Sequence, residues 1–203
     1  MRARSLAFPL MLVVLSGCMT SRSLRGVPRD VPFVTRYEWG AAEPVAAMKP
    51  HVPQRITIHH TAGRQAPARS AAEKMRALQA FSQREDSLDD GRRKPAWPDV
   101  PYHFYVAVDG TVVEGRDLGF AGDSNTPYDP TGHLLVVLEG NFEEEDVTPA
   151  QRASLYRLVW SLARRWKIPA DQIRGHRDFA QTLCPGERLY GDLAALRNFV
   201  ARR

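Results

Sequence analysis

The chain has 203 residues, of which 43% are hydrophobic and 25% are charged, and it carries a net charge of +5. This composition is ordinary for a globular protein, and it excludes a disordered chain; we find no repeat that would indicate a solenoid. Because no basic stripe with interleaved aromatic residues accompanies the positive charge, we expect no nucleic-acid partner.

The chain begins with a segment typical of protein export. Two arginines precede the apolar run 6–15, which is too short to span the ~30 Å core of a membrane. The small residues before Cys18 resemble the lipobox of bacterial lipoproteins, in which this cysteine is acylated. We predict that residues 1–18 are a lipoprotein signal and that lipid on Cys18 holds the protein to a membrane surface. A plain secretory signal is the alternative. Met19 in place of Asp favours the periplasmic side of the outer membrane over the inner membrane.

A polar segment separates this signal from the first predicted elements. Residues 19–33 read as a flexible tether, so we expect the folded domain over 34–203. The β-branched run 55–60 predicts a strand. A capping box at 70–73 opens a helix, and the polar stretch 86–99 predicts a loop.

The second half of the chain also alternates strands and helices. Asp109-Gly110 lies between two strand-like runs and predicts a hairpin, and 134–138 is an apolar strand expected to be buried on both faces. Residues 148–151 combine a capping box with an early proline and open a long helix that Pro169 ends. A last helix is expected around 192–201. The order predicts an α/β fold with a single mixed sheet flanked by helices.

Three segments carry the candidate imidazole and thiol ligands: 59–61, 102–103 and 175–186. Zinc prefers such ligands, and a catalytic zinc site uses three of them and leaves a fourth position open. The chain has only two cysteines, and if Cys18 carries lipid then Cys184 has no disulfide partner, which metal ligation would explain. Spacing alone leaves open that the histidines are structural.

The residues around these candidates match one family in order along the chain. The matching motifs lie at 35–41, 56–62, 97–104, 109–116, 138–142, 175–178 and 182–190. Together they closely resemble the amidase family that includes the peptidoglycan recognition proteins and the phage lysozyme-type N-acetylmuramoyl-L-alanine amidases.

This resemblance implies a Zn²⁺ ion held by His59, His176 and Cys184. It also implies an enzyme that hydrolyses the amide between the muramic acid lactyl group and L-alanine, in peptidoglycan or muropeptides. Tyr102 matches the family's catalytic tyrosine and would orient water or stabilise the developing oxyanion, while Thr182 would donate a hydrogen bond nearby. We expect a monomer.

Strand parity favours His59 over its neighbour as the ligand. Thr57 and His59 share one face of the predicted strand, whereas Ile56, Ile58 and His60 share the other, and the polar face is the one expected to meet the site. His60 is then expected to pack or to form a hydrogen bond at the rim.

The chain departs from the family pattern at two places. A related intracellular branch has a catalytic Glu where this chain has Val137, and Glu139 lies two residues further along, so we expect a structural role for Glu139. Many members have a His within the stretch that reads Phe120-Ala-Gly-Asp123 here, so the peptide side of the groove is expected to differ. For Asp123, Asn125 and Arg177 we expect solvated surface positions, with stem-peptide contacts as the alternative.

Three other functions stay open at this stage. Relatives that bind peptidoglycan without cutting it commonly have Ser in place of the ligand cysteine, and the presence of Cys184 argues against such a binding module. An amidase restricted to anhydro-muropeptides differs in groove shape, which the sequence does not reveal. Hydrolysis of some other amide on the same scaffold is the third.

Overall fold

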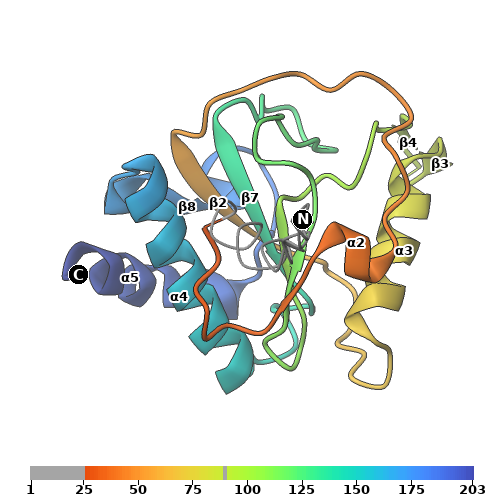
Figure 1. Ribbon diagram of the computed structural model, residues 1–203. Helices are drawn as coiled ribbons and strands as arrows, with labels where there is room; N and C mark the ends of the chain where they lie inside the picture. The colour runs from red at the N-terminus through yellow and green to blue at the C-terminus, as the bar shows by residue number, and fades with distance from the viewer. Residues whose placement is uncertain (1–25, 89–90) are drawn as a thin grey trace, which may run out of the picture.

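The computed structural model describes residues 26–88 and 91–203. The predicted signal, Cys18 and the first part of the predicted tether lie outside the described residues. The centre of the fold is a six-stranded sheet in the order β1-β6-β5-β7-β2-β8 (Figure 1). The strands are β1 (Phe33–Val34), β2 (Arg55–His60), β5 (Phe104–Val106), β6 (Val112–Glu114), β7 (His133–Leu138) and β8 (Ile173–Gly175).

The sheet is mixed, as predicted. β5 and β6 form the antiparallel hairpin, and the other neighbouring strands are parallel. Gly110 occupies the turn of this hairpin with φ +83°, a conformation that favours glycine. All six residues of β7 are buried, because this strand has neighbours on both edges and helices over both faces.

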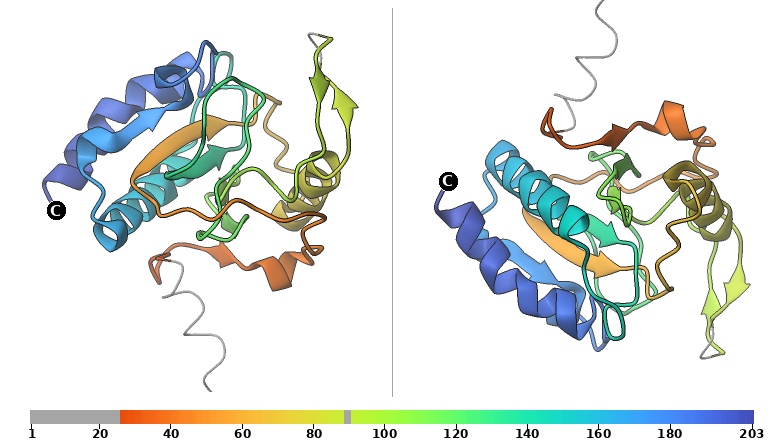
Figure 2. Two further views of the ribbon diagram at one scale, coloured as in Figure 1. Left: turned by 90° about the horizontal axis from the view of Figure 1, so that it is seen from above. Right: turned by 90° about the horizontal axis from the view of Figure 1, so that it is seen from below.

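Helices cover the two faces of the sheet. α4 (Pro149–Trp166) and α5 (Glu187–Ala201) lie on one side, and α2 (Arg36–Trp39) and α3 (Ala71–Ser82) lie on the other (Figure 2). Ile56 and Ile58 of β2 belong to the core cluster shared with α4 and α5. Parity therefore directs Thr57 and His59 to the opposite face, which α2 and α3 cover only in part.

The predicted helix starts are confirmed. The Ser70 hydroxyl accepts from the backbone of Glu73 at the start of α3, and the Thr148 hydroxyl accepts from the backbone of Gln151 at the start of α4. Each is a complete capping box. α4 ends at Trp166, ahead of the proline that was expected to end it.

Three elements differ from the prediction. α5 begins at Glu187, five residues before the start expected from the sequence, and the four-residue α2 is not among the predicted elements. The polar stretch 86–99 contains a small hairpin of β3 (Asp86–Ser87) and β4 (Arg93–Lys94). Lys94 holds this hairpin against the end of α3, because its buried ammonium donates to three backbone carbonyls, those of residues 82, 84 and 95.

The packed part of the chain begins earlier than Val34, where the sequence placed its start. Val27 and Val31 are buried in the cluster beneath α4. Two isolated apolar residues in a polar stretch carry no periodic signal, which is why the sequence pattern assigned them to the tether.

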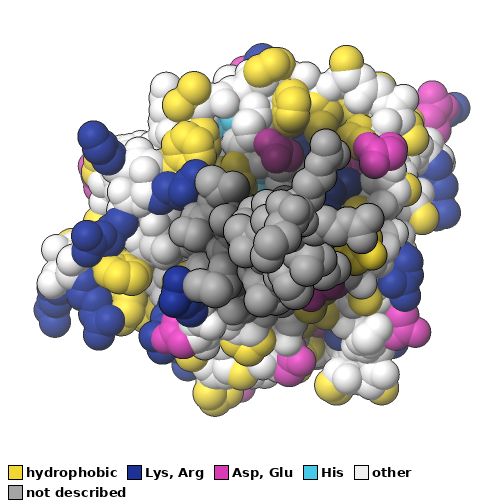
Figure 3. All heavy atoms as spheres, in the orientation of Figure 1, with side chains coloured by type: hydrophobic (Ala, Val, Ile, Leu, Met, Phe, Trp, Pro, Cys, Tyr) yellow, Lys and Arg dark blue, Asp and Glu magenta, His cyan; other side chains and the backbone are white. Residues whose placement is uncertain are grey.

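Within residues 26–88 and 91–203, no helix combines the length and the apolar character needed to cross a membrane. Figure 3 shows Lys and Arg side chains gathered where α5 ends, whereas acidic and basic side chains are mixed on the right and along the lower edge of this view. Arg202 and Arg203 are exposed at that end of the chain.

Candidate metal centre

Adjacent strands bring the two candidate histidines together. In the parallel pair of β2 and β8, Ile58 lies opposite Gly175. His59 and His176 follow these two residues, so they occupy the same end of the sheet. His176 begins a short 3-10 helix, η2 (His176–Asp178), and Cys184 lies in the loop between η2 and α5.

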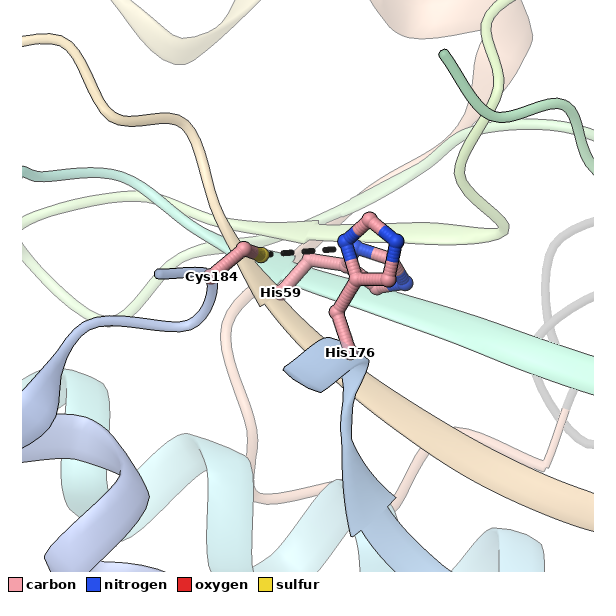
Figure 4. A group of neighbouring side chains, drawn as sticks. All are labelled: His59, His176 and Cys184. Carbon is pink, nitrogen blue, oxygen red and sulfur yellow. Dashed lines mark hydrogen bonds between the residues drawn. The ribbon is translucent and has the colours of Figure 1, made fainter. Parts of the chain in front are cut away.

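The three side chains point toward one another (Figure 4). One ligand atom from each of His59, His176 and Cys184 lies within 4.8 Å of the others. The sulfur of Cys184 is 3.6 Å from Nδ1 of His59, and the two imidazole centroids are 4.5 Å apart. The structure therefore brings together the three residues that the resemblance implied as ligands.

The electrostatics of the cluster suit a cation. Burial holds the pKa of His59 well below its usual range and lowers the pKa of His176 to about 4, so both imidazoles are neutral at pH 7. Burial also raises the pKa of the Cys184 thiol to about 12. A bound cation reverses that preference, because it stabilises the thiolate directly.

This donor set fits zinc. Two neutral imidazoles and one thiol are nitrogen and sulfur donors of the kind that zinc prefers, and three is the number of protein ligands in a catalytic zinc site. Neither ring nitrogen of His59 is committed to an oxygen acceptor: Nδ1 faces the sulfur of Cys184, and the buried Nε2 has no hydrogen-bond partner among the described residues.

His60 has a different role from its neighbour. Its Nδ1 accepts a hydrogen bond of 3.4 Å from the backbone of Phe142, on the far side of the strand. Its own backbone N–H donates to the sulfur of Cys184 at 3.4 Å. The side chain of His60 thus packs at the rim, and its backbone supports the thiol.

Tyr102 and Thr182 both lie beside the cluster. The ring centroid of Tyr102 is 5.2 Å from that of His59, and burial raises the pKa of this phenol, which therefore keeps its proton. The hydroxyl of Thr182 accepts from the backbone N–H of Cys184 at 3.2 Å. That bond leaves the hydroxyl proton of Thr182 available to a further acceptor.

Arg177 is not the solvated side chain that the sequence suggested. Its backbone N–H donates to the carbonyl of Cys184 at 2.9 Å. Its guanidinium pairs with Glu187 at 2.6 Å and with Glu143 at 3.2 Å, and it lies over the ring of Tyr190. Arg177 therefore fixes the loop that carries Cys184.

Asp123 also differs from its expected surface role, because it pairs with the buried guanidinium of Arg116. The carbonyl of half-buried Asn125 accepts from Arg92 at 2.8 Å. The carboxylate of Asp123 is thus used within the fold.

Glu139 is buried in an ion pair with Lys74. Its carboxylate lies 2.8 Å from the ammonium of Lys74 and accepts from the backbones of Ala66 and Val108 at 2.8 and 3.2 Å. These contacts occupy both oxygens and agree with a structural role.

Two residues that the sequence did not single out contact His176. The hydroxyl of Thr126 is 2.7 Å from Nε2 of His176, and the ring of Tyr128 lies 5.1 Å from the His176 ring between centroids. Both belong to a polar, proline-containing loop outside the matching motifs, so no residue pattern marked them.

Comparisons with known proteins agree with this geometry. The family described as N-acetylmuramoyl-L-alanine amidase matches residues 49–187. Mouse peptidoglycan recognition protein 1 is 31% identical over 188 residues, which cover 90% of this chain and 93% of that protein.

Solved structures share the fold. The endolysin N-acetylmuramoyl-L-alanine amidase LysCS of Clostridium intestinale superposes with a TM-score of 0.64 at 26% identity, over 85% of this chain and 97% of that one. A human peptidoglycan recognition protein in complex with glycosamyl muramyl pentapeptide gives a TM-score of 0.66 at 27% identity, over 80% and 94% of the two chains.

Proposed function

This chain belongs to the N-acetylmuramoyl-L-alanine amidase family, and from that premise we propose that it is a zinc-dependent amidase of peptidoglycan. The bond cut is the amide between the muramic acid lactyl group and L-alanine. The observation that carries the proposal is the convergence of His59, His176 and Cys184 within 4.8 Å. A relative that binds a muramyl peptide supports the same class of substrate.

The residues at this site have two proposed roles, metal binding and hydrogen bonding to the substrate. His59, His176 and Cys184 would hold zinc, which supplies Lewis-acid chemistry by lowering the pKa of water and polarising the scissile carbonyl. Tyr102 keeps its phenolic proton and can donate it as a hydrogen bond to the oxygen that gains charge. Thr182 offers a second hydroxyl, held in place by the backbone of Cys184.

The rival function in this family is binding without cleavage. The thiol of Cys184 argues for the enzyme, because a hydroxyl at this position would replace a strong zinc ligand with a weak one. Cys184 and the loop that carries it are also held by Arg177, so the ligand is fixed in place before any metal binds.

The test is digestion of intact sacculi by protein lacking residues 1–18. We expect about one zinc per chain, as a three-ligand site implies, and the release of free stem peptides identified by mass spectrometry. Cys184→Ala should lose both zinc and release, whereas Leu183→Ala, which changes the exposed neighbour, should keep both. Normal cleavage by Cys184→Ala would overturn the mechanism.

The same measurement separates the possible substrates. Release from intact sacculi identifies an enzyme that acts on the wall, and release only from anhydro-muropeptides identifies one that acts on fragments. Binding to sacculi with no released peptide from either substrate identifies a recognition module.

We also propose that lipid on Cys18 holds the enzyme to the periplasmic side of a bacterial membrane, preferentially the outer one. The small residues before Cys18 support this proposal. Cys18→Ser should move the protein from the membrane fraction to the soluble fraction and abolish incorporation of labelled palmitate. Unchanged membrane association in this variant would contradict it.

A further inference from the structure

The two histidines of the metal centre differ in the hydrogen-bond partner of their Nε2 atoms. Nε2 of His176 lies 2.7 Å from the hydroxyl of Thr126, whereas Nε2 of His59 has no partner among the described residues. Nε2 of His176 is therefore held by a protein hydroxyl, whereas Nε2 of His59 is not.

The contact belongs to a short hydrogen-bonded chain. The hydroxyl of Thr126 lies 2.7 Å from the hydroxyl of Ser124, and the backbone N–H of Thr126 donates to the same Ser124 oxygen at 3.1 Å. When Nε2 of His176 donates to Thr126, the proton of Thr126 is directed to Ser124. Each hydroxyl then has a defined partner, and the ring of His176 is left with one free lone pair, on Nδ1.

Packing restricts the same imidazole. The ring of Tyr128 lies 5.1 Å from the ring of His176 and stacks on Phe179, with centroids 6.0 Å apart and planes inclined by 19°. Because Thr126 and Tyr128 belong to one loop, this loop controls both the tilt of the His176 ring and its hydrogen bond.

We propose that Thr126 is a positioning residue for the metal centre. Its hydroxyl fixes the proton of His176 on Nε2, and the lone pair of Nδ1 is thereby presented to zinc. This inference rests on the proposed function. Hydrogen-bond partners of metal-bound histidines generally raise metal affinity by about 10- to 100-fold, because they orient the ring before the metal arrives.

The experiment compares Thr126→Val with Thr126→Ser in the full chain, purified in detergent. Valine keeps the volume of threonine and removes the hydroxyl, whereas serine keeps the hydroxyl. We expect Thr126→Val to weaken zinc binding about 10- to 100-fold in competition with a chelator. Thr126→Ser should stay within about threefold of the unmodified chain.

The visible absorption spectrum of the Co²⁺-substituted protein distinguishes a displaced His176 ligand from a general loss of structure. The Co²⁺-substituted protein should show displaced visible absorption bands in Thr126→Val and unchanged bands in Thr126→Ser. Thr131→Val is the matched control, because its hydroxyl belongs to the same loop but bonds the exposed Asp129. If Thr126→Val does not fold, Ser124→Ala should shift affinity in the same direction by a smaller factor.

The outcomes distinguish this inference from the proposed function. Equal zinc affinity and equal Co²⁺ spectra in the unmodified chain and Thr126→Val would overturn the role of Thr126 alone. An unmodified chain that binds no zinc would overturn the proposed function and this inference with it.

Discussion

The sulfur of Cys184 lies 3.6 Å from Nδ1 of His59, although 125 positions separate the two residues in the chain. Two further contacts hold the sulfur there: the backbone N–H of His60 points at it, and Arg177 ties its loop to the residues after β8. The three ligands are therefore brought together by contacts of the sheet and the loop that do not involve the metal. Replacing one ligand should remove the metal and leave the fold intact.

The first prediction separates the adjacent histidines. His59→Ala should lose zinc and activity, because it removes one of three ligands. His60→Ala should retain zinc and lose about 1 kcal/mol of stability, because its side chain makes one long hydrogen bond to Phe142. Zinc content by elemental analysis and urea unfolding measure the two effects. The reverse pattern would show that His60 is the ligand.

The second prediction concerns Tyr102. Tyr102→Phe should lower the rate of amide hydrolysis about 100- to 1000-fold, as loss of an oxyanion donor does, and should leave zinc content unchanged. Tyr105→Phe is the control, because that hydroxyl bonds Glu139 and not one of the three candidate ligands. A Tyr102→Phe enzyme with an unchanged rate would exclude Tyr102 from the chemistry.

The third prediction assigns Glu139 to stability. Glu139→Gln leaves the buried ammonium of Lys74 without its counter-ion and should cost about 3–5 kcal/mol of unfolding free energy. Zinc content of the folded protein should not change. The double variant with Lys74→Met should recover part of the loss, because it removes the unpaired charge. Loss of activity with full stability would instead indicate a catalytic carboxylate.

Much of the fold was predictable because its signals are local. The β-branched run 55–60 and the capping boxes at 70–73 and 148–151 depend on residues a few positions apart, and the structure confirms each predicted element. Strand parity also placed His59 on the correct face.

What the sequence could not reveal depends on contacts between distant segments. Thr126 meets His176 across 50 positions. Asp123 and Arg116 are only seven positions apart, but they meet through the fold of the irregular segment after β6, which no periodic pattern marks. In such loops the sequence of a solvated polar residue looks the same as that of a polar residue that contacts a metal-binding side chain, so only the structure distinguishes the two.

The last prediction is an acid sensitivity centred on His103. This buried ring is tied at both nitrogens: Nδ1 accepts from the backbone of Leu135 at 2.8 Å, and Nε2 lies 2.9 Å from the carbonyl of Phe120. Protonation of Nδ1 would place its proton against the N–H of Leu135, which already donates to this nitrogen. Burial lowers the pKa of His103 to about 3. An unfolded histidine titrates near its ordinary pKa of about 6.5. Between these values the unfolded chain binds one more proton at this site than the folded chain does.

The stability contributed by His103 is therefore complete above the unfolded pKa and is lost as the pH falls from there toward the folded pKa of about 3. The loss amounts to about 1.4 kcal/mol per pH unit from this residue. Other buried histidines add to the total slope, so the test compares urea unfolding of the chelator-treated protein with that of His103→Gln at a series of pH values. The variant starts less stable, but its free energy of unfolding should fall less steeply with acid by about 1.4 kcal/mol per unit. Parallel slopes would mean that His103 takes up its proton while the protein is still folded, contrary to the hydrogen bonds that hold it.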